Sequence, residues 1–292
     1  MRLCSERLGV QTYTHIIEPE LEIPARQLDT LNGDLARLVG GEPLQYVLGF
    51  EEFCGRRFKV GPGVLIPRPE TEELVRLALE KFPEGGSALD LCTGSGCIAW
   101  SLALGRPGAR VTAVDISDQA LETAARQFAP GGSGVGSSSE TSLRSSLPLR
   151  GPLPFTWPRA AMVSEELPSP LTPTFVKWDV LEVPEAFEGA PFDVITANPP
   201  YIRRSERERM HINVLQHEPE LALFVPDTDP LIFYRSIAQW TCRFLKPGGF
   251  GIVEINEDFG AATAGVFASA GLRDVSVAHD FRGKERFVHF TK

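Results

Sequence analysis

The hydrophobic residues from Ser87 onward fall into short apolar runs, and most runs are followed by a loop and then by a segment of helical spacing. This alternation of strand, loop and helix is typical of a parallel sheet with helices on both faces. We therefore predict an α/β fold. The expected strands are residues 87–92, 110–115, 175–180, 192–198, 249–256, 275–280 and 286–290. The expected helices are residues 97–104, 117–129, 230–245 and 260–270, with Ser117 as a candidate N-cap and with Gly105 and Gly271 as candidate C-caps.

The part of the chain before Ser87 has a weaker pattern. The leucines between residues 28 and 38 have a helical spacing within a polar segment, which predicts one or two short helices. Two alternating segments with glycine between them predict a hairpin, and a helix with Pro69 in its first turn follows. We therefore divide the chain into a short helical N-terminal appendage (1–45), a hairpin and linker helix (46–86) and a main domain (87–292).

Residues 131–171 interrupt the main domain, because they are rich in glycine, serine and proline and have no hydrophobic period. Such a segment cannot bury enough apolar surface to offset the entropy lost on ordering, so we expect a mobile surface insertion. A partner-binding loop is the alternative, since Phe155 and Trp157 lie within it.

The composition limits the partners and the location. The net charge of -9 makes the average surface repel phosphate backbones, so we expect no stable nucleic-acid binding. The five cysteines form no C-x-x-C pair and the five histidines show no ligand spacing, so we expect no disulfide and no metal site. Charged residues at the N-terminus argue against a signal peptide, and no apolar run approaches the ~20 residues of a membrane span. We expect a cytoplasmic monomer that does not bind membranes.

The stretch LDLCTGSGCIA (89–99) places small residues between a predicted strand and a predicted helix. Gly94 and Gly96 let the backbone turn tightly and approach a ligand, and the following helix offers free N–H groups. Asp115, at the end of the next strand, can accept both hydroxyls of a ribose. This pattern indicates a nucleoside cofactor, although G-x-G-x-x-A also fits a dinucleotide-binding domain, and a glycine pair can be an ordinary tight turn.

The carboxylates at the strand ends favour one cofactor. Asp90 can hold the positively charged amino group of S-adenosylmethionine, whereas it would repel the pyrophosphate of a dinucleotide. Asp179, at the end of the third predicted strand, is a candidate for contacting the adenine amino group.

The stretch ITANPPYI (195–202) ends a predicted core strand in a stiff polar corner. Asn198 offers a neutral acceptor and a donor, Pro199 and Pro200 have a fixed φ and no N–H, and Tyr201 adds a flat face. The Asn198 side-chain oxygen and the Pro199 carbonyl can accept both hydrogens of a planar NH2 group. Its nitrogen lone pair would then point at a sulfonium methyl, and positioning would supply much of the rate. The alternative is a turn that only ends the strand.

Together these motifs resemble the protein N5-glutamine methyltransferases that modify peptide chain release factors, the PrmC/HemK family. The matching stretches are PLQYVLG (43–49), PGVLIPRPETEELV (62–75), LDLCTGSGCIA, AVDIS (113–117), FDVITANPPYI (192–202), HEPELAL (217–223), FLKPGG (244–249) and DFRGKERF (280–287). The resemblance implies a Rossmann-like, seven-stranded S-adenosylmethionine-dependent methyltransferase fold with a small, abbreviated helical N-terminal appendage. It also implies S-adenosylmethionine as donor and the glutamine of the release factors' Gly-Gly-Gln motif as acceptor.

The resemblance carries over to site residues by position. It implies that the donor is contacted by Asp90, Leu91, Cys92, Thr93, Gly94, Gly96, Asp115, Asp179, Val180 and Asn198, and that the glutamine is held by Asn198, Pro199, Pro200 and Tyr201. We assign no role to Glu254, although it lies near the end of a predicted strand.

Other functions remain open on the sequence. A methyltransferase acting on the exocyclic amine of adenine or guanine in DNA or RNA would use the same NPPY corner, but it should carry a basic recognition surface. A non-catalytic scaffold would have no need for Asp90, Gly94, Asp115 and Asn198 together. An NAD-dependent oxidoreductase is disfavoured, because its reaction gives the NPPY motif no role.

Overall fold

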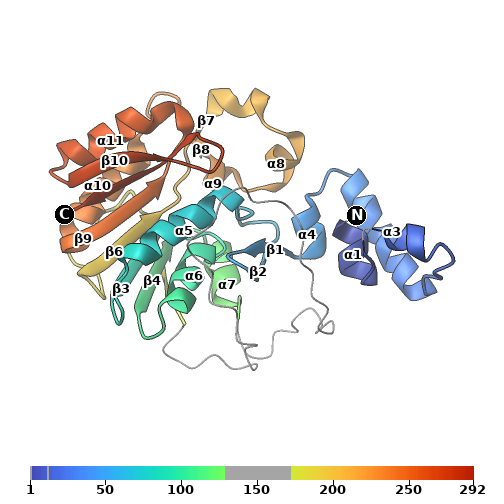
Figure 1. The fold of residues 1–292 in the computed structure, drawn as a ribbon. Helices are drawn as coiled ribbons and strands as arrows, with labels where there is room; N and C mark the ends of the chain where they lie inside the picture. The colour runs from blue at the N-terminus through green and yellow to red at the C-terminus, as the bar shows by residue number, and fades with distance from the viewer. Residues whose placement is uncertain (1, 12, 129–171) are drawn as a thin grey trace.

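The computed structural model describes residues 2–11, 13–128 and 172–292 (Figure 1). The insertion predicted at residues 131–171 lies outside the described residues. None of the helices in the described ranges is both long enough and apolar enough to cross a membrane.

A seven-stranded sheet forms the centre of the molecule, in the order β10-β11-β9-β6-β3-β4-β5. Its strands are β3 (Ser87–Leu91), β4 (Arg110–Asp115), β5 (Thr174–Lys177), β6 (Phe192–Ala197), β9 (Leu245–Glu254), β10 (Arg273–His279) and β11 (Glu285–Thr291). The paired strands are parallel except that β11 is antiparallel to both its neighbours. The predicted seven-stranded α/β fold is confirmed. The strand order reverses direction between β3 and β6, and such a point is where ligands bind in open α/β sheets.

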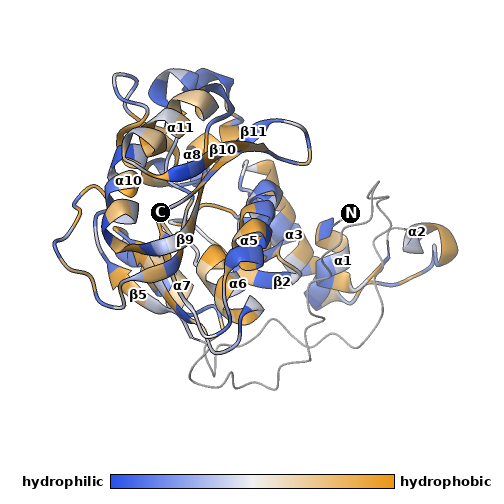
Figure 2. Ribbon diagram, turned by 60° about the vertical axis from the view of Figure 1, so that its left-hand side comes forward, coloured by the Kyte–Doolittle hydropathy of each residue, from blue (hydrophilic) through white to orange (hydrophobic). Residues whose placement is uncertain are grey.

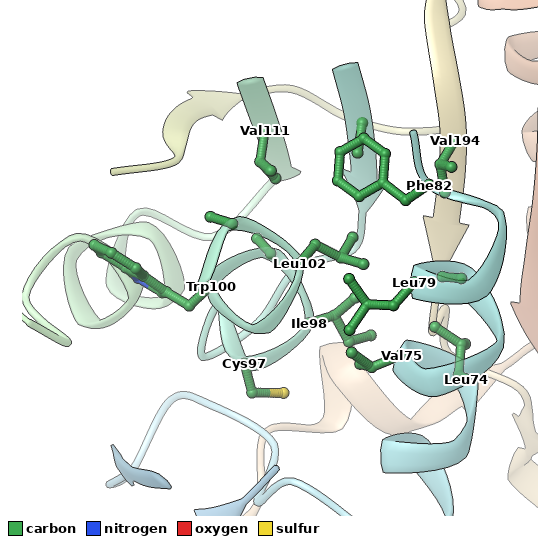
Figure 3. Close-up of a cluster of buried hydrophobic side chains, with 14 of the residues drawn as sticks. Leu74, Val75, Leu79, Phe82, Cys97, Ile98, Trp100, Leu102, Val111 and Val194 are labelled. Atoms are coloured by element: carbon green, nitrogen blue, oxygen red, sulfur yellow. The ribbon is translucent and has the colours of Figure 1, made fainter. Parts of the chain in front are cut away.

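Helices cover both faces of this sheet (Figure 1). One face carries α5 (Pro69–Lys81), α6 (Cys97–Gly105) and α7 (Asp118–Ala125), and the other carries α10 (Ile232–Phe244) and α11 (Gly260–Ser269). Figure 3 shows the hydrophobic cluster under α5 and α6. Neighbouring residues of β3 join different cores: Ala88 belongs to this cluster, whereas Leu89 packs under α10 and α11. Figure 2 shows α5 with both hydrophilic and hydrophobic residues, as expected for a helix with one buried side.

Several element boundaries differ from the predicted ones. The third strand ends at Lys177 rather than at residue 180, because β4, with which it pairs, ends at Asp115 opposite Lys177. The fifth strand begins at Leu245 rather than 249: Leu245 already pairs with Phe192, and a register shift follows. The helix predicted at 117–129 ends at Ala125, and Ser117 is its N-cap, accepting a hydrogen bond from the backbone N–H of Ala120.

The N-terminal part contains more helix than predicted. Its helices are α1 (Arg2–Leu8), α2 (Thr14–Ile17), α3 (Ala25–Val39) and α4 (Leu44–Leu48). The prediction of one or two short helices was therefore wrong, since α3 alone has 15 residues. Leu3, Leu31 and Phe50 are buried in one cluster with α4, and a hydrogen-bonded ion pair between Arg7 and Asp34 (2.6 Å) links α1 to α3. This small core extends from α1 to the start of β1.

A hairpin attaches this part to the main sheet. It consists of β1 (Phe50–Phe53) and β2 (Arg56–Lys59), so the residues before Phe50 form α4 rather than the predicted start of the hairpin. Cys54 and Gly55 both have positive φ (49° and 69°), as a two-residue type I′ turn requires. Phe53 and Phe58 are fully buried in the α5–α6 cluster, so the hairpin is packed against the main domain.

The segment between β6 and α10 was not predicted. It contains the short parallel pair β7 (Ile202–Arg203) and β8 (Phe224–Val225), with the 3-10 helix η2 (Arg204–Arg209), α8 (Ile212–His217) and α9 (Glu220–Leu223) between them. A second 3-10 helix, η3 (Glu257–Phe259), follows β9. The HEPELAL stretch (217–223) lies in the segment between β6 and α10, from the last residue of α8 to the last residue of α9.

Candidate active site

A cavity of about 190 Å³ lies at the carboxyl ends of β3, β4 and β6. Its walls are the loop that leads into α5, the glycine loop after β3, the end of β4, the loop after β5, the corner after β6, and α9. One water needs only ~10–15 Å³ of such space, so the cavity has room for a small organic molecule. It is at the reversal of the strand order, where the fold predicts a ligand.

The two glycines of the loop after β3 have different constraints. Both have positive φ, +55° at Gly94 and +78° at Gly96. A Cβ on Gly96 would lie 2.8 Å from the Cβ of Ala124, so this position must be glycine for α6 and α7 to pack. A Cβ on Gly94 would meet no atom within 4 Å, and Gly94 lines the cavity. Gly94 therefore leaves space for a ligand, whereas Gly96 shapes the loop.

Asp115 connects the end of β4 to the glycine loop. One of its carboxylate oxygens accepts from the N–H of Gly94 (2.8 Å) and the other from the N–H of Ser117 (2.9 Å). Burial raises the pKa of Asp115, and the backbone N–H groups oppose this rise. Asp115 lines the cavity, and a carboxylate has about four acceptor positions, so Asp115 can accept further hydrogen bonds there.

Asp90 lies beneath the cavity rather than in its wall. It has no exposed surface, and its carboxylate accepts from the hydroxyls of Thr93 (2.6 Å) and Thr196 (2.8 Å). Burial raises its pKa to about 7, while the two hydroxyls act in the opposite direction. Asp90 is two residues after Ala88 along β3, so it lies on the same face of the sheet, which α5 and α6 cover. It therefore holds Thr93, which does line the cavity, in place.

The loop after β5 forms another wall. Asp179 does not end the strand, as the sequence had predicted, but follows two residues later. Its side-chain oxygen accepts from the N–H of Leu181 (2.9 Å), which fixes the turn. Asp179 and Val180 both line the cavity, and the carbonyl of Val180 accepts from the indole N–H of Trp240 (2.8 Å).

The corner after β6 separates this cavity from a second hollow. Asn198 and Pro200 line the cavity, Pro199 is buried behind them, and Tyr201 lines the second hollow, of about 260 Å³. The residues that line both spaces are Leu65, Arg68, Asn198 and Ala222. Asn198 thus stands at the boundary of two adjoining spaces, as the transfer of a group between two molecules requires.

The structure brings together most of the predicted site residues. Those at the cavity wall are Cys92, Thr93, Gly94, Asp115, Asp179, Val180, Asn198 and Pro200. Those outside the wall are Asp90, Leu91, Gly96, Pro199 and Tyr201.

Sequence reasoning missed Thr71 and Glu254. The hydroxyl of Thr71, in the first turn of α5, lies 3.4 Å from the side-chain nitrogen of Asn198 and 2.7 Å from a carboxylate oxygen of Glu254. The other oxygen of Glu254 accepts from the hydroxyl of Tyr201 (3.0 Å). Burial raises the pKa of Glu254, and the two hydroxyls oppose this rise. The sequence feature that could have pointed to Thr71 is its position within the PRPETEELV stretch.

Two further residues join two segments of the cavity wall. The carboxylate of Glu218, in the HEPELAL stretch, accepts from Arg68 (2.6 Å) and from the backbone N–H of Ile66 (3.1 Å). Glu218 is buried, and Arg68 lines both hollows. This pair attaches the loop before α5 to the segment that contains α8 and α9.

The sheet order, the single antiparallel strand, the glycine loop after β3 and the Asn-Pro-Pro-Tyr corner after β6 define the class of S-adenosylmethionine-dependent methyltransferases. A solved methyltransferase from Pyrococcus furiosus has this fold: it is 17% identical, covers 89% of this chain and 98% of its own, and has a TM-score of 0.50. The family profile of the PrmC N-terminal domain matches residues 2–49.

Curated relatives identify the family. The release factor glutamine methyltransferase of Bacteroides thetaiotaomicron is 38% identical over 99% of this chain and 90% of its own length. That of Flavobacterium psychrophilum is 34% identical over 94% of this chain and 84% of its own. The chain belongs to the release factor glutamine methyltransferase family.

Proposed function

We propose that this chain transfers a methyl group from S-adenosylmethionine to the side-chain nitrogen (N5) of the glutamine in the Gly-Gly-Gln motif of peptide chain release factors. The observation that carries the proposal is the position of Asn198 between two adjoining hollows. The first hollow has the features of a nucleoside site, and the second is open to an acceptor side chain.

The residues of the first hollow fit the donor. Asp115 and Asp179 place carboxylates at its wall, which favours a cationic ligand and disfavours a pyrophosphate. Val180, Ile116 and Phe233 offer apolar surface to an adenine ring. We infer that Asp115 holds the ribose hydroxyls and that Gly94 allows close approach of the methionine part. S-adenosylmethionine supplies an electrophilic methyl group on a sulfonium.

The Asp90 assignment changes with the structure. Its two oxygens already accept from Thr93 and Thr196, and it lies outside the cavity wall. We propose that Asp90 orients Thr93 from below the cavity, rather than contacting the donor's amino group itself.

The corner after β6 fits the acceptor. An amide nitrogen is a poor nucleophile because its lone pair is delocalised, so the corner must hold the glutamine amide with that lone pair directed at the methyl group. We propose that the Asn198 side-chain oxygen and the Pro199 carbonyl accept the two amide hydrogens. No hydrogen bond from the described residues occupies the Pro199 carbonyl. Tyr201 lines the second hollow, where the glutamine side chain would enter.

A labelled-donor assay tests the proposal. The chain is incubated with methyl-labelled S-adenosylmethionine and, separately, a release factor, duplex DNA and ribosomal RNA. We expect label on the release factor and its loss when the Gly-Gly-Gln glutamine is replaced. Label on nucleic acid alone would instead support an exocyclic-amine methyltransferase.

A substitution tests the role of Asn198. Asn198→Ala should reduce turnover by roughly 10² to 10³, the scale for removing one preorganised polar contact at a reacting centre, while donor affinity falls less. Asn32→Ala, at an exposed position of α3, is the matched control and should leave donor binding unchanged. Equal loss of donor binding and turnover in Asn198→Ala would contradict the acceptor role.

A further inference from the structure

Asn198 is the last member of a chain of contacts that reaches the buried end of β9. Its side-chain nitrogen lies 3.4 Å from the hydroxyl oxygen of Thr71, and that oxygen lies 2.7 Å from Glu254. Thr71 and Glu254 are only 2% and 1% exposed, so water does not compete for these contacts. A third group, the hydroxyl of Tyr201, lies 3.0 Å from the other oxygen of Glu254.

Counting hydrogens fixes the direction of each contact. In its carboxylate form Glu254 has no hydrogen to donate, so the hydroxyls of Thr71 and Tyr201 must both donate to it. Thr71 has one hydroxyl hydrogen, and it is used in this way. The Thr71 oxygen can therefore only accept from Asn198, and the group of Asn198 that faces it must be the NH2. The carbonyl oxygen of the Asn198 amide then faces away from Thr71.

This direction matters because an asparagine amide can occupy two orientations with almost the same shape. In one orientation Asn198 offers an acceptor to an incoming NH2 group, and in the other it offers a second NH2 group that would repel it. At an apolar neighbour neither orientation would be preferred. The Thr71 oxygen, with its hydrogen committed to Glu254, stabilises only the first.

We infer that Glu254 is a positioning residue, which acts through Thr71 to hold the acceptor oxygen of the Asn198 amide toward the substrate and which directly fixes the ring of Tyr201. The inference rests on the proposed function, since it concerns the acceptor side of the same site. It assigns a task to three residues contributed by α5, β9 and the corner after β6, far apart in the sequence. Tyr201 is held at its other end as well, because the Asn256 amide donates to its backbone carbonyl (3.2 Å).

The test uses three threonine variants and compares kcat with KM. Thr71→Val keeps the shape and removes the hydroxyl, so kcat on the release factor should fall about tenfold, the factor that corresponds to one hydrogen bond of ordinary strength. The KM for S-adenosylmethionine should change by less than about twofold, because valine keeps the shape of Thr71 at the wall of the first hollow. Thr71→Ser keeps the hydroxyl and should restore most of the turnover.

Thr263→Val is the matched control. Thr263 is fully buried in α11, and its hydroxyl has no hydrogen-bond partner among the described residues. Its replacement changes a buried threonine to valine but removes none of the contacts that join Glu254, Thr71 and Asn198, so kcat should stay at the wild-type value. A purely structural role for Thr71 would lower the melting temperature, lower kcat and raise the KM for S-adenosylmethionine together.

Two results would overturn the inference: wild-type kcat in Thr71→Val, or equal impairment of Thr71→Ser and Thr71→Val. A measurement on the wild-type protein is independent of how the variants fold. Nuclear Overhauser contacts should join the Asn198 NH2 hydrogens to the Thr71 side chain, and their absence would equally refute it. If the wild type methylates no release factor, the proposed function fails, whereas the orientation of Asn198 is still measured by this contact.

Discussion

Two glycines in one loop give the sharpest test of how the cavity is built. Gly96→Ala adds a Cβ 2.8 Å from the Cβ of Ala124 and 3.3 Å from its Cα, so α7 must move away from α6. Such overpacking costs about 1–3 kcal/mol, and an alanine at φ +78° costs about 1–2 kcal/mol more. The free energy of unfolding should therefore fall by about 2–5 kcal/mol, a large part of the typical ~5–15 kcal/mol.

Gly94→Ala is the matched variant. It has the same chemistry and a similar φ of +55°, but its Cβ would meet no atom within 4 Å. Its free energy of unfolding should fall by only about 1–2 kcal/mol. Its Cβ would however occupy space at the cavity wall, so affinity for S-adenosylmethionine should fall about tenfold or more, which is 1.4 kcal/mol or more of binding energy.

Chemical denaturation and titration calorimetry with S-adenosylmethionine measure both quantities for each variant. Gly96→Ala should mainly lose stability, and Gly94→Ala should mainly lose donor affinity. The opposite ranking, or wild-type donor affinity in Gly94→Ala, would refute the assignment of Gly94 to the ligand site.

Three other predictions concern buried polar groups. The pKa of Asp90 is raised from 3.8 to about 7, so the free energy of unfolding should fall as the pH rises from about 4 through 7, by up to about 4 kcal/mol. Between pH 5 and pH 8, the free energy of unfolding of Asp90→Asn should change less than that of the wild type. An equal change in both proteins would contradict this. Thr263→Val should raise the free energy of unfolding by about 1 kcal/mol, because it removes a hydroxyl with no partner among the described residues; a lower melting temperature would show that the hydroxyl is satisfied. Glu218→Gln should raise the KM for the release factor, because Arg68 loses a charged partner at 2.6 Å at the wall of both hollows. An unchanged KM would show that Arg68 does not contact the acceptor.

The sequence predicted the elements whose signals are local. Gly271 was expected at a helix C-cap, and it follows α11 with φ +89°. Gly105 carried the same expectation but is the last residue of α6 itself, and a Cβ there would lie 2.8 Å from Leu79 of α5. The same residue type was thus required for a different reason, which only the packing of two helices reveals.

Site residues that lie at the end of a predicted strand could be found from the sequence. Site residues that meet only because of the order of the strands in the sheet could not. Asn198, Asp115 and Gly94 lie at the ends of parallel strands and meet as expected. Thr71 and Glu254 are 183 residues apart, and their contact depends on β6 and β9 being neighbours and on α5 crossing that face. The direction of Asp90 likewise depends on which face of β3 it occupies.

The central claim is that Asn198 and Pro199 hold a glutamine amide with its nitrogen directed at the donor's methyl group. A crystal structure with S-adenosylhomocysteine and a Gly-Gly-Gln peptide measures this directly. We predict that the glutamine Nε2 lies about 3 Å from both the Asn198 side-chain oxygen and the Pro199 carbonyl, within hydrogen-bond range, and faces the sulfur. A glutamine amide bound away from Asn198, or an Asn198 that turns its NH2 toward the peptide, would contradict the account.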